Sequence, residues 1–436
     1  MSRPAIPRGF AGKSLRRVLH TPRRLARRRA RGLSLVELMV GVTLGLLITA
    51  ALLTLLADIS RNRTQLAVAG QVNENGRFAV NLLANHAVHA GFWGGFIPSY
   101  DDLTLADGAN FAQDYPAEVV SSPSQGTDTT AVPDPCKARA NWSAQYRTNL
   151  MAIPVQVYRI ADPVPDPVLS VCASIVNSPL AGTDVLIMRH AETCAAGSCA
   201  NCPGECVAGS CPNCPALSTG EEFFQLNNCY TVASGTISPR YVFANAIPGS
   251  NTALKRNCTS AADQHRFVSN LFYIRTFSVT AGDGIPTLMH ARFGVSGGTP
   301  QFLSAQPLIP GIQGFRVEVG VDDRRTGDTT ATVNRNNIEW ADTTNLKTPR
   351  NRGDGVPDTW VTCPAIGCTA DQLTNAVALR LHVLSRSERT SAGPNDTKTY
   401  TLAGSTLGPF NDGFRRHVFT QTVRLHNVSS RRETPP

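Results

Sequence analysis

Cysteines are the residues of this 436-residue chain whose type and spacing most clearly allow chemistry. Six of the 12 cysteines fall within 21 residues and carry a 12-residue internal repeat: Cys194, Cys199, Cys202, Cys206, Cys211 and Cys214. Paired Cys-x-x-Cys motifs have the spacing of zinc ligands. In an oxidising compartment the same thiols would instead form three disulfides and hold together a loop that lacks a hydrophobic core. We favour disulfides, because the membrane topology described below places this loop outside the cytoplasm.

The other six cysteines are spread along the chain, at Cys136, Cys172, Cys229, Cys258, Cys363 and Cys368. Cys363 and Cys368 are close enough in sequence to close a small loop. The even total is compatible with full pairing, although the sequence does not specify which cysteines join. Such cysteine usage argues against a reducing cytosol as the final compartment.

Other candidate sites are weaker. His86 and His89 lie three residues apart on a predicted helix and could share a metal ion, but without a third ligand a packed or solvated pair is the simpler interpretation. Asp322 and the stretch 353–358 around Asp354 could offer oxygen ligands to calcium, yet turn chemistry explains them equally well. No P-loop and no His-Glu-x-x-His motif occurs. We therefore expect no metal site, no cofactor and no enzymatic activity.

The positive charge of the chain is concentrated at its beginning. Residues 1–32 hold 11 lysines and arginines and no acidic residue, whereas residues 33–436 hold 30 basic and 32 acidic residues. The body therefore lacks the charge of a nucleic-acid-binding protein, and no nucleic acid partner is predicted. After the basic block comes an apolar run of 24 residues, 33–56. As a helix it would be about 36 Å long and could cross a hydrocarbon core of about 30 Å. Arginines before the run and none within it predict a cytoplasmic N-terminus and a body across the membrane.

One acidic residue, Glu37, interrupts the apolar run near its start. A lone carboxylate at that depth is costly unless it finds a partner. Residues 31–39, Arg-Gly-Leu-Ser-Leu-Val-Glu-Leu-Met, resemble the type IV prepilin signal for cleavage and methylation. The resemblance implies that a prepilin peptidase cuts between Gly32 and Leu33 and that the new N-terminus is methylated. It also implies that Glu37 pairs with the Leu33 ammonium of a neighbouring subunit.

The predicted helix has packing features both within and beyond the membrane span. Gly41 and Gly45, four residues apart, would let neighbouring membrane helices approach closely. Beyond the span, apolar residues recur at spacings of three and four with a gap at Gly76, namely Leu66, Ala69, Val72, Val80, Leu83, Ala87 and Ala90. This stripe should pack on a sheet. Three glycines are expected to end the helix, at Gly91, Gly94 and Gly95.

The chain after residue 95 consists of short β-rich runs separated by Gly, Pro, Asn and Asp clusters. Residues 377–383 alternate as a half-buried strand should. We therefore expect an α+β, pilin-like fold. Its long N-terminal helix, membrane-spanning in the first half, would pack on an antiparallel β-sheet with loop insertions.

Several segments resemble the PilW family of minor pilins. The clearest are residues 73–83, which begin Asn-Glu-Asn-Gly-Arg-Phe-Ala, and the helix exit Ala-Gly-Phe-Trp-Gly at 90–94. Further similar segments are residues 183–189, 272–275, 285–288, 311–322 and 423–427. The resemblance implies a minor pilin that takes part in type IV pilus assembly or priming at the tip. The implied partners are other minor pilins, the major pilin, the prepilin peptidase, the inner-membrane assembly platform and a tip adhesin.

The resemblance also implies how the chain is divided. Residues 1–32 would be a basic leader that is removed, 33–56 the membrane span, and 57–95 the amphipathic half of the helix. Residues 96–436 would form a periplasmic body with a Cys-rich insertion at 194–214. The implied location is the inner membrane and then the pilus. Two other functions stay open: a J-type pseudopilin of a type II secretion system, and a membrane-anchored periplasmic metal or redox protein that uses the cysteine cluster.

Overall fold

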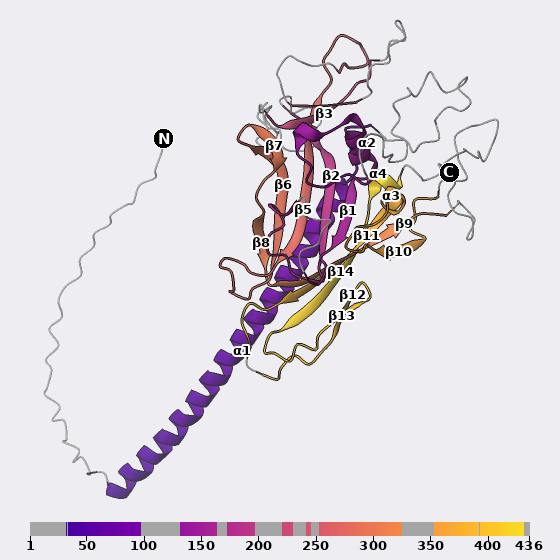
Figure 1. Cartoon of the computed structure of the whole chain (residues 1–436). Coiled ribbons are helices and arrows are strands. Elements are labelled where there is room, and N and C mark those ends of the chain that lie inside the picture. The colour runs from indigo at the N-terminus through magenta and orange to yellow at the C-terminus, as the bar shows by residue number, and fades with distance from the viewer. Residues whose placement is uncertain are drawn as a thin grey trace, which may run out of the picture. The chain divides into compact units, whose positions relative to one another are not determined.

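The structure is a computed structural model that describes residues 32, 34–96, 131–163, 172–196, 220–229, 241–245, 253–324, 353–391 and 393–430. The chain forms two compact units, residues 1–60 and 61–436. One helix, α1 (Leu35–His89), contributes to both units (Figure 1). The remaining described elements are strands and short helices of the second unit.

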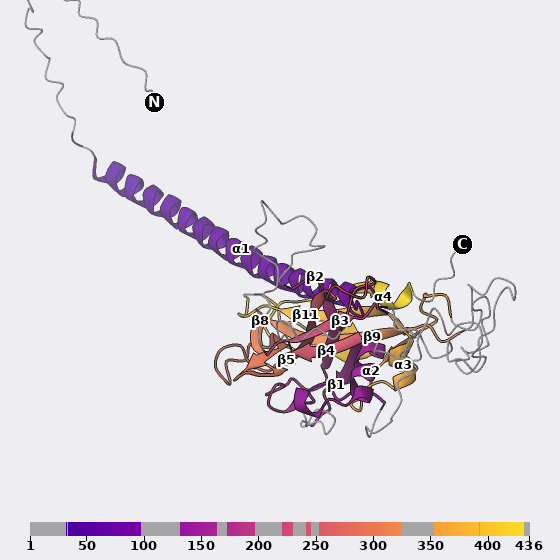
Figure 2. The same cartoon turned by 90° about the horizontal axis from the view of Figure 1, so that it is seen from above.

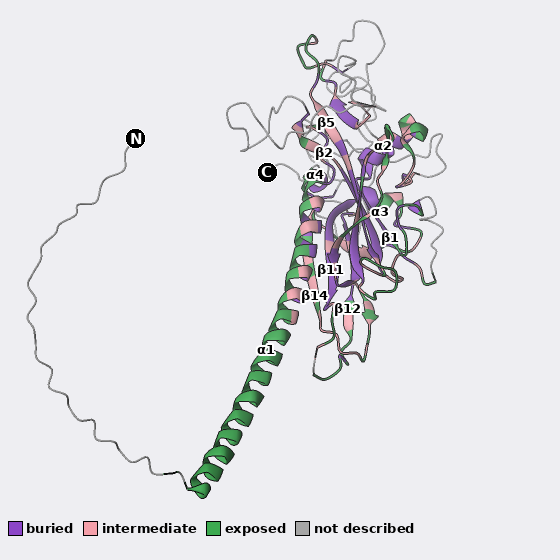
Figure 3. Cartoon of the chain, turned by 90° about the vertical axis from the view of Figure 1, so that its left-hand side faces the viewer, coloured by how far each residue is buried: buried purple, intermediate pink, exposed green. Residues whose placement is uncertain are grey.

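The part of α1 in the first unit is an apolar rod. Every described side chain from residue 34 to residue 60 is exposed (Figure 3). This part is long and apolar enough to cross a membrane. Its threonine hydroxyls donate to helix carbonyl groups three or four residues earlier, at distances from 2.8 to 3.0 Å. Such bonds lower the cost of placing hydroxyl groups in lipid.

The larger sheet of the second unit has eight antiparallel strands. They are β1 (Val155–Arg159), β2 (Asp184–Ala195), β3 (Glu222–Leu226), β4 (Tyr241–Asn245), β5 (Gln264–Arg275), β6 (Thr287–Ser296), β7 (Thr299–Phe302) and β8 (Gln306–Pro310). The main path is β1-β2-β5-β3-β4. The long strand β5 pairs with β2 along one edge. Along its other edge it pairs first with β3 and then with β6. β6 in turn pairs with β7 and β8.

The second sheet has four antiparallel strands in the order β10-β9-β11-β14. These strands are β9 (Ile312–Val321), β10 (Thr359–Thr362), β11 (Ala376–Arg386) and β14 (Arg416–Arg424). A separate hairpin joins β12 (Tyr400–Leu402) and β13 (Ser405–Leu407). The short helices are η1 (Arg139–Asn141), α2 (Ala144–Ala152), α3 (Ala370–Thr374) and α4 (His426–Ser429).

The expectation of a half-buried strand at residues 377–383 is wrong, because β11 is buried on both faces. One face contributes Leu379 and Leu381 to the main core. Beside the other face, the β12–β13 hairpin packs so closely that a Cβ at Gly314 would lie within 3.4 Å of Leu384, Leu402 and Leu407.

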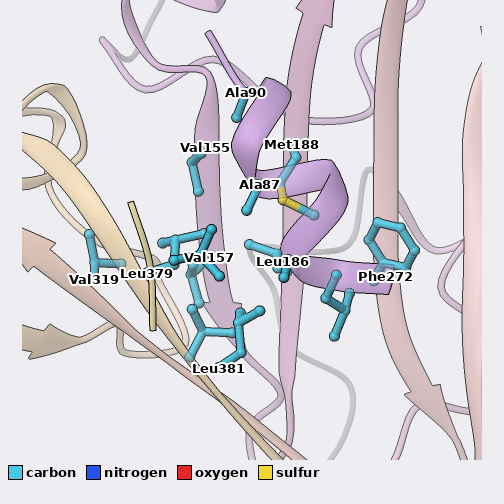
Figure 4. Close-up of a cluster of buried hydrophobic side chains, with 14 of the residues drawn as sticks. Ala87, Ala90, Val155, Val157, Leu186, Met188, Phe272, Val319, Leu379 and Leu381 are labelled. Carbon is cyan, nitrogen blue, oxygen red and sulfur yellow. The ribbon is translucent and has the colours of Figure 1, made fainter. Parts of the chain in front are cut away.

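The main core joins the second half of α1 to both sheets. Figure 4 shows Ala87 of α1 and Ala90, just after the helix, beside Leu186 and Met188 of β2, with residues of β1 and β11 in the same cluster. Small helix residues at this point allow the helix to lie close to the sheets. α1 ends at His89, and Gly91 follows with a φ of 78°, a left-handed conformation that glycine adopts without strain.

The apolar stripe of α1 differs from the expected one at its start and at its middle. Leu66 is 73% exposed and Ala69 is also exposed, and the first buried residue of the helix is Val72. Gly76, expected to be a gap in the stripe, is buried and belongs to it. The α+β class, with a long apolar helix and antiparallel sheets, is confirmed.

Candidate functional site

The first candidate site is the start of α1. Leu33 lies outside the described residues, and Gly32 and Ser34 precede the helix. The backbone N–H of Ser34 donates to Oε2 of Glu37 at 3.2 Å, and the N–H of Leu38 donates to the carbonyl of Ser34 at 3.1 Å. This is the glutamate half of a capping box, and it places a carboxylate at the positive end of the helix dipole. The Ser-x-x-Glu spacing was the available signal for this contact, which the sequence analysis missed.

The two glycines of the membrane half lie on an open helix surface. A Cβ added to Gly41 or Gly45 would meet no atom within 4 Å. Neither glycine is therefore needed for packing within the single chain. Their expected role in helix–helix contact between subunits stays a prediction.

α1 approaches the body closely at Gly76. A Cβ at this position would lie 2.0 Å from Cε2 and 2.2 Å from Cδ2 of Phe419 on β14. Glycine is therefore the residue that lets the Phe419 ring sit on the helix backbone. The neighbouring Glu74, Arg77 and Phe78 point outward and are exposed, Phe78 by 53%. The segment 73–83 thus divides into a face toward the body and a face toward the surroundings.

Amide side chains fix the helix to the body on either side of Gly76. Nε2 of Gln71 donates to Glu388 at 2.7 Å, and Nδ2 of Asn75 donates to the carbonyl of Pro310 at 3.0 Å. At the helix end, Nδ2 of Asn427 lies 3.2–3.4 Å from the last carbonyl oxygens, those of residues 88, 89 and 90. Asn427 belongs to α4, which lies beside the end of α1 (Figure 2). The segment 423–427 therefore contains the end of β14 and the start of α4.

A buried ion pair links the two sheets. Oδ2 of Asp184 on β2 accepts from the N–H of Val317 at 2.7 Å and lies 3.3 Å from Nε of Arg316 on β9. Burial raises the pKa of Asp184 to about 7, opposed by the charge of Arg316. Because Asp184 is fully buried, its hydrogen bond and its charge partner are needed to offset the cost of removing its carboxylate from water.

A second candidate site is a cavity of about 500 Å³ beside the last turns of α1. Its walls come from α1, β2, β3, β5 and β6, and its lining includes His86, His89 and His190. We call it the histidine cavity. The ring centroids of His89 and His190 are 5.7 Å apart, and each Nδ1 donates to a main-chain carbonyl. Burial and neighbouring histidines lower the pKa of His190 to about 4.

His86 belongs to a different set of contacts at the same cavity. Its ring centroid lies 5.2 Å from Phe272 and 6.0 Å from His290. Asn270 bridges the two imidazoles, because its Nδ2 donates to Nδ1 of His86 at 3.3 Å and its Oδ1 accepts from Nε2 of His290 at 2.8 Å. Burial, His290 and His89 lower the pKa of His86 to about 4. His86 and His89 therefore have separate partners instead of a shared one.

The residues considered as possible metal ligands have other roles in the structure. Among the described residues, no group of three His, Cys, Asp or Glu side chains is placed to hold a metal ion. Oδ2 of Asp322 accepts from the N–H of Gly355 at 2.7 Å, and Oδ2 of Asp358 accepts from two backbone N–H groups. These carboxylate oxygen atoms therefore accept hydrogen bonds from the backbone of the turns. Residues 294–298 spell G-x-S-x-G but lie at the β6–β7 hairpin, without the strand–turn–helix geometry of a nucleophile elbow.

Three cysteine pairs of the body are joined. They are Cys136–Cys172, Cys229–Cys258 and Cys363–Cys368, with S–S distances of 2.08, 1.99 and 1.99 Å. Cys363–Cys368 closes the small loop that its spacing predicted. Cys194 is also disulfide-bonded, while Cys199, Cys202, Cys206, Cys211 and Cys214 lie outside the described residues.

Comparison with known proteins gives one family match. Residues 271–427, from β5 to α4, match the PilW family model, described as type IV pilus-assembly protein W. No curated protein matches the chain. Among solved structures, a type IV-like pilin from Thermus thermophilus matches with 14% sequence identity and a TM-score of 0.25, over 58% of this chain and 81% of that one. The family match, the long apolar helix and the antiparallel sheets together support a PilW-family pilin related to the type IV pilus.

Proposed function

We propose that this chain is a minor pilin that takes part in priming type IV pilus assembly and resides at the pilus tip. Its role is assembly and interaction and not catalysis. The observation that supports this most directly is α1 itself. One uninterrupted helix begins as an exposed apolar rod and ends as a core element of a β-rich body. Such a helix can anchor the body in a membrane and later pack against the helices of a fibre.

Processing at the helix start is part of the proposal. Residues 1–32 would be removed, Leu33 would become the methylated N-terminus, and residues 33–56 would span the inner membrane. The second unit would then lie in the periplasm, where its disulfides are stable. The proposed partners are the prepilin peptidase, the assembly platform, other minor pilins, the major pilin and a tip adhesin.

Assembly would use the charge of Glu37. Within one chain, only its Oε2 has a bond that the described residues show, to the backbone of Ser34. In lipid, a carboxylate gains most from a full counter-charge. The Leu33 ammonium of a neighbouring chain would supply it and fix the register of the two helices. Gly41 and Gly45 would then allow the helices to approach closely.

The test compares two carboxylates of the same helix. Glu37→Ala and Glu37→Gln remove the charge in the apolar part, and Glu74→Ala removes an exposed charge beside the body. We expect all three variants in the membrane fraction. Only the Glu37 variants should lose, by tenfold or more, co-isolation with the other pilins and the ability to support pili. Normal pili and normal co-isolation in Glu37→Gln would rule out the charge-pairing model.

A further inference from the structure

The end of α1 is held on the larger sheet by imidazole contacts that the proposed assembly role does not explain. We propose that His86, Asn270 and His290 form an acid-sensitive latch, which keeps the last turns of α1 on the sheet at neutral pH and releases them on acidification. The three residues come from α1, β5 and β6, so the latch connects the helix to the sheet centre.

In the amide orientation of the structure, the hydrogen bonds of Asn270 match a neutral His86. An amide Nδ2 can only donate, so Nδ1 of His86 must carry a lone pair; the Oδ1 of Asn270 can only accept, so Nε2 of His290 must carry a proton. Protonation of His86 would place an N–H against the Nδ2 group. Turning the amide over would restore both bonds only if His290 also moved its proton from Nε2 to Nδ1. Asn270 is 3% exposed, so the lost bond would leave a largely buried amide group without its partner.

The surroundings of the latch do not stabilise an imidazolium. The rings of His86 and His290 both contact Phe272, His86 in a tilted arrangement at a centroid distance of 5.2 Å and His290 stacked at 4.8 Å, so a second charge would lie close to the first. On β2, His190 is half-buried, and Glu192 is paired with Arg266 of β5. On β6, Arg292 adds a positive charge.

The two carboxylates at the start of β3 are also engaged: Glu221, which precedes the strand, and Glu222. Glu221 lies 3.8 Å from Arg266, and Glu222 pairs with Arg139 at 2.7 Å. His89 is on the same turn of α1 and is exposed at the cavity. The C-terminal end of the helix favours a positive charge nearby. For His86, its burial and its hydrogen bond with Asn270 oppose such a charge. The cavity gives water and protons access to the latch.

The direction of the pH effect follows from the lowered pKa of His86, about 4 instead of 6.5. A histidine that is neutral in the closed state and protonates on opening stabilises the closed state fully above pH 6.5. This stabilisation is lost as the pH falls from 6.5 toward 4. Between pH 7 and pH 5, His86 alone raises the opening equilibrium by about 20-fold. His190, whose pKa is lowered in the same way, acts in the same direction.

The experiment is hydrogen–deuterium exchange with mass spectrometry on the full chain in detergent, at pH 7 and pH 5, with correction for intrinsic exchange. Peptides covering residues 79–93 report on the latch, and peptides from β11 report on the body. Wild type should show a rise of about 20-fold or more in opening at residues 79–93 between pH 7 and pH 5, with little change in β11. His86→Gln keeps an acceptor for Asn270 but does not titrate. In this variant the rise in opening at residues 79–93 between pH 7 and pH 5 should therefore be smaller by about 20-fold.

Two further variants separate a latch from a merely structural contact. His417→Gln, an exposed histidine of β14, should keep the wild-type pH dependence. Asn270→Asp offers acceptors to both imidazoles, so it should weaken the closed state at pH 7 and oppose opening at pH 5. If the latch variants do not fold, exchange of the histidine C2 proton in wild type, followed as a function of pH, measures the pKa of His86 directly. A half-point for His86 below pH 5 supports the latch. A half-point above pH 6, or equal pH dependence in His86→Gln and wild type, overturns it.

Discussion

The contact between Gly76 and Phe419 predicts opposite effects for two glycine-to-alanine changes on the same helix. Gly70 and Gly76 both lie inside α1, where alanine is more favourable than glycine by about 1 kcal/mol. At Gly70 a Cβ meets no atom within 4 Å, so Gly70→Ala should stabilise the protein by up to that amount. At Gly76 the added Cβ would lie 2.0 Å from the Phe419 ring, where carbon atoms normally keep about 3.5–4.0 Å.

The Phe419 ring must move or the helix must shift to admit this methyl group. Adding a methyl group to a packed interface costs about 1–3 kcal/mol. Subtracting the gain in helix propensity leaves Gly76→Ala less stable than wild type by about 1 kcal/mol. The difference between the two variants should therefore be about 2 kcal/mol. Urea unfolding of the full chain in detergent, followed by tryptophan fluorescence, measures it as a shift of the midpoint at constant slope.

The cause can be assigned by removing the ring. In a Phe419→Ala background, Gly76→Ala should become stabilising, with a coupling energy of about 2 kcal/mol in the double-mutant cycle. If Gly76→Ala and Gly70→Ala stabilise wild type equally, Phe419 does not lie on Gly76. If the cycle shows no coupling, the cost arises elsewhere. Either result would refute the described docking of α1.

Three further predictions concern the body. The buried carboxylate of Asp396 lies 2.9 Å from Arg416. Arg416→Met removes this charge partner and should lower the free energy of unfolding by about 3 kcal/mol. Urea titration measures the loss, with Lys398→Met as the control. Asn427→Ala removes the cap on the last carbonyl groups of α1 and should lower the free energy of unfolding by about 1 kcal/mol. Unchanged hydrogen–deuterium exchange at residues 85–91 would contradict the cap. Replacing Cys363 and Cys368 by alanine opens a loop of sequence separation 5 and should cost about 2 kcal/mol, whereas opening Cys136–Cys172, of separation 36, should cost about 4 kcal/mol. Equal losses of stability would contradict that ranking.

The sequence predicted those features that depend on local periodicity. The apolar run and the stripe that follows predicted one long helix, and the short β-rich runs predicted an antiparallel body. Gly76 shows where this reasoning stops. Periodicity counts side chains, so a glycine looks like a gap, although its missing side chain is what admits Phe419 from a strand more than 300 residues later.

The division into two sheets could not be predicted either, because it depends on pairing between distant segments. The ion pair of Asp184 with Arg316 and the cap by Asn427 join residues more than 100 positions apart. The latch has the same origin, since His86 meets Asn270 across 184 positions. His86 and His89 were noticed as a pair on one helix face, but their partners come from strands whose order the sequence does not reveal. The Glu37 cap, in contrast, is local, and its Ser-x-x-Glu pattern was visible.

The proposal that this chain is a processed pilin is tested most directly by the intact mass of the protein purified from its native membrane. The account predicts a single species that begins at Leu33 and carries one methyl group, and a slower appearance of that species in Gly32→Ala. A protein that begins at Met1, or a Gly32→Ala variant that yields the Leu33 species as fast as wild type, would contradict it.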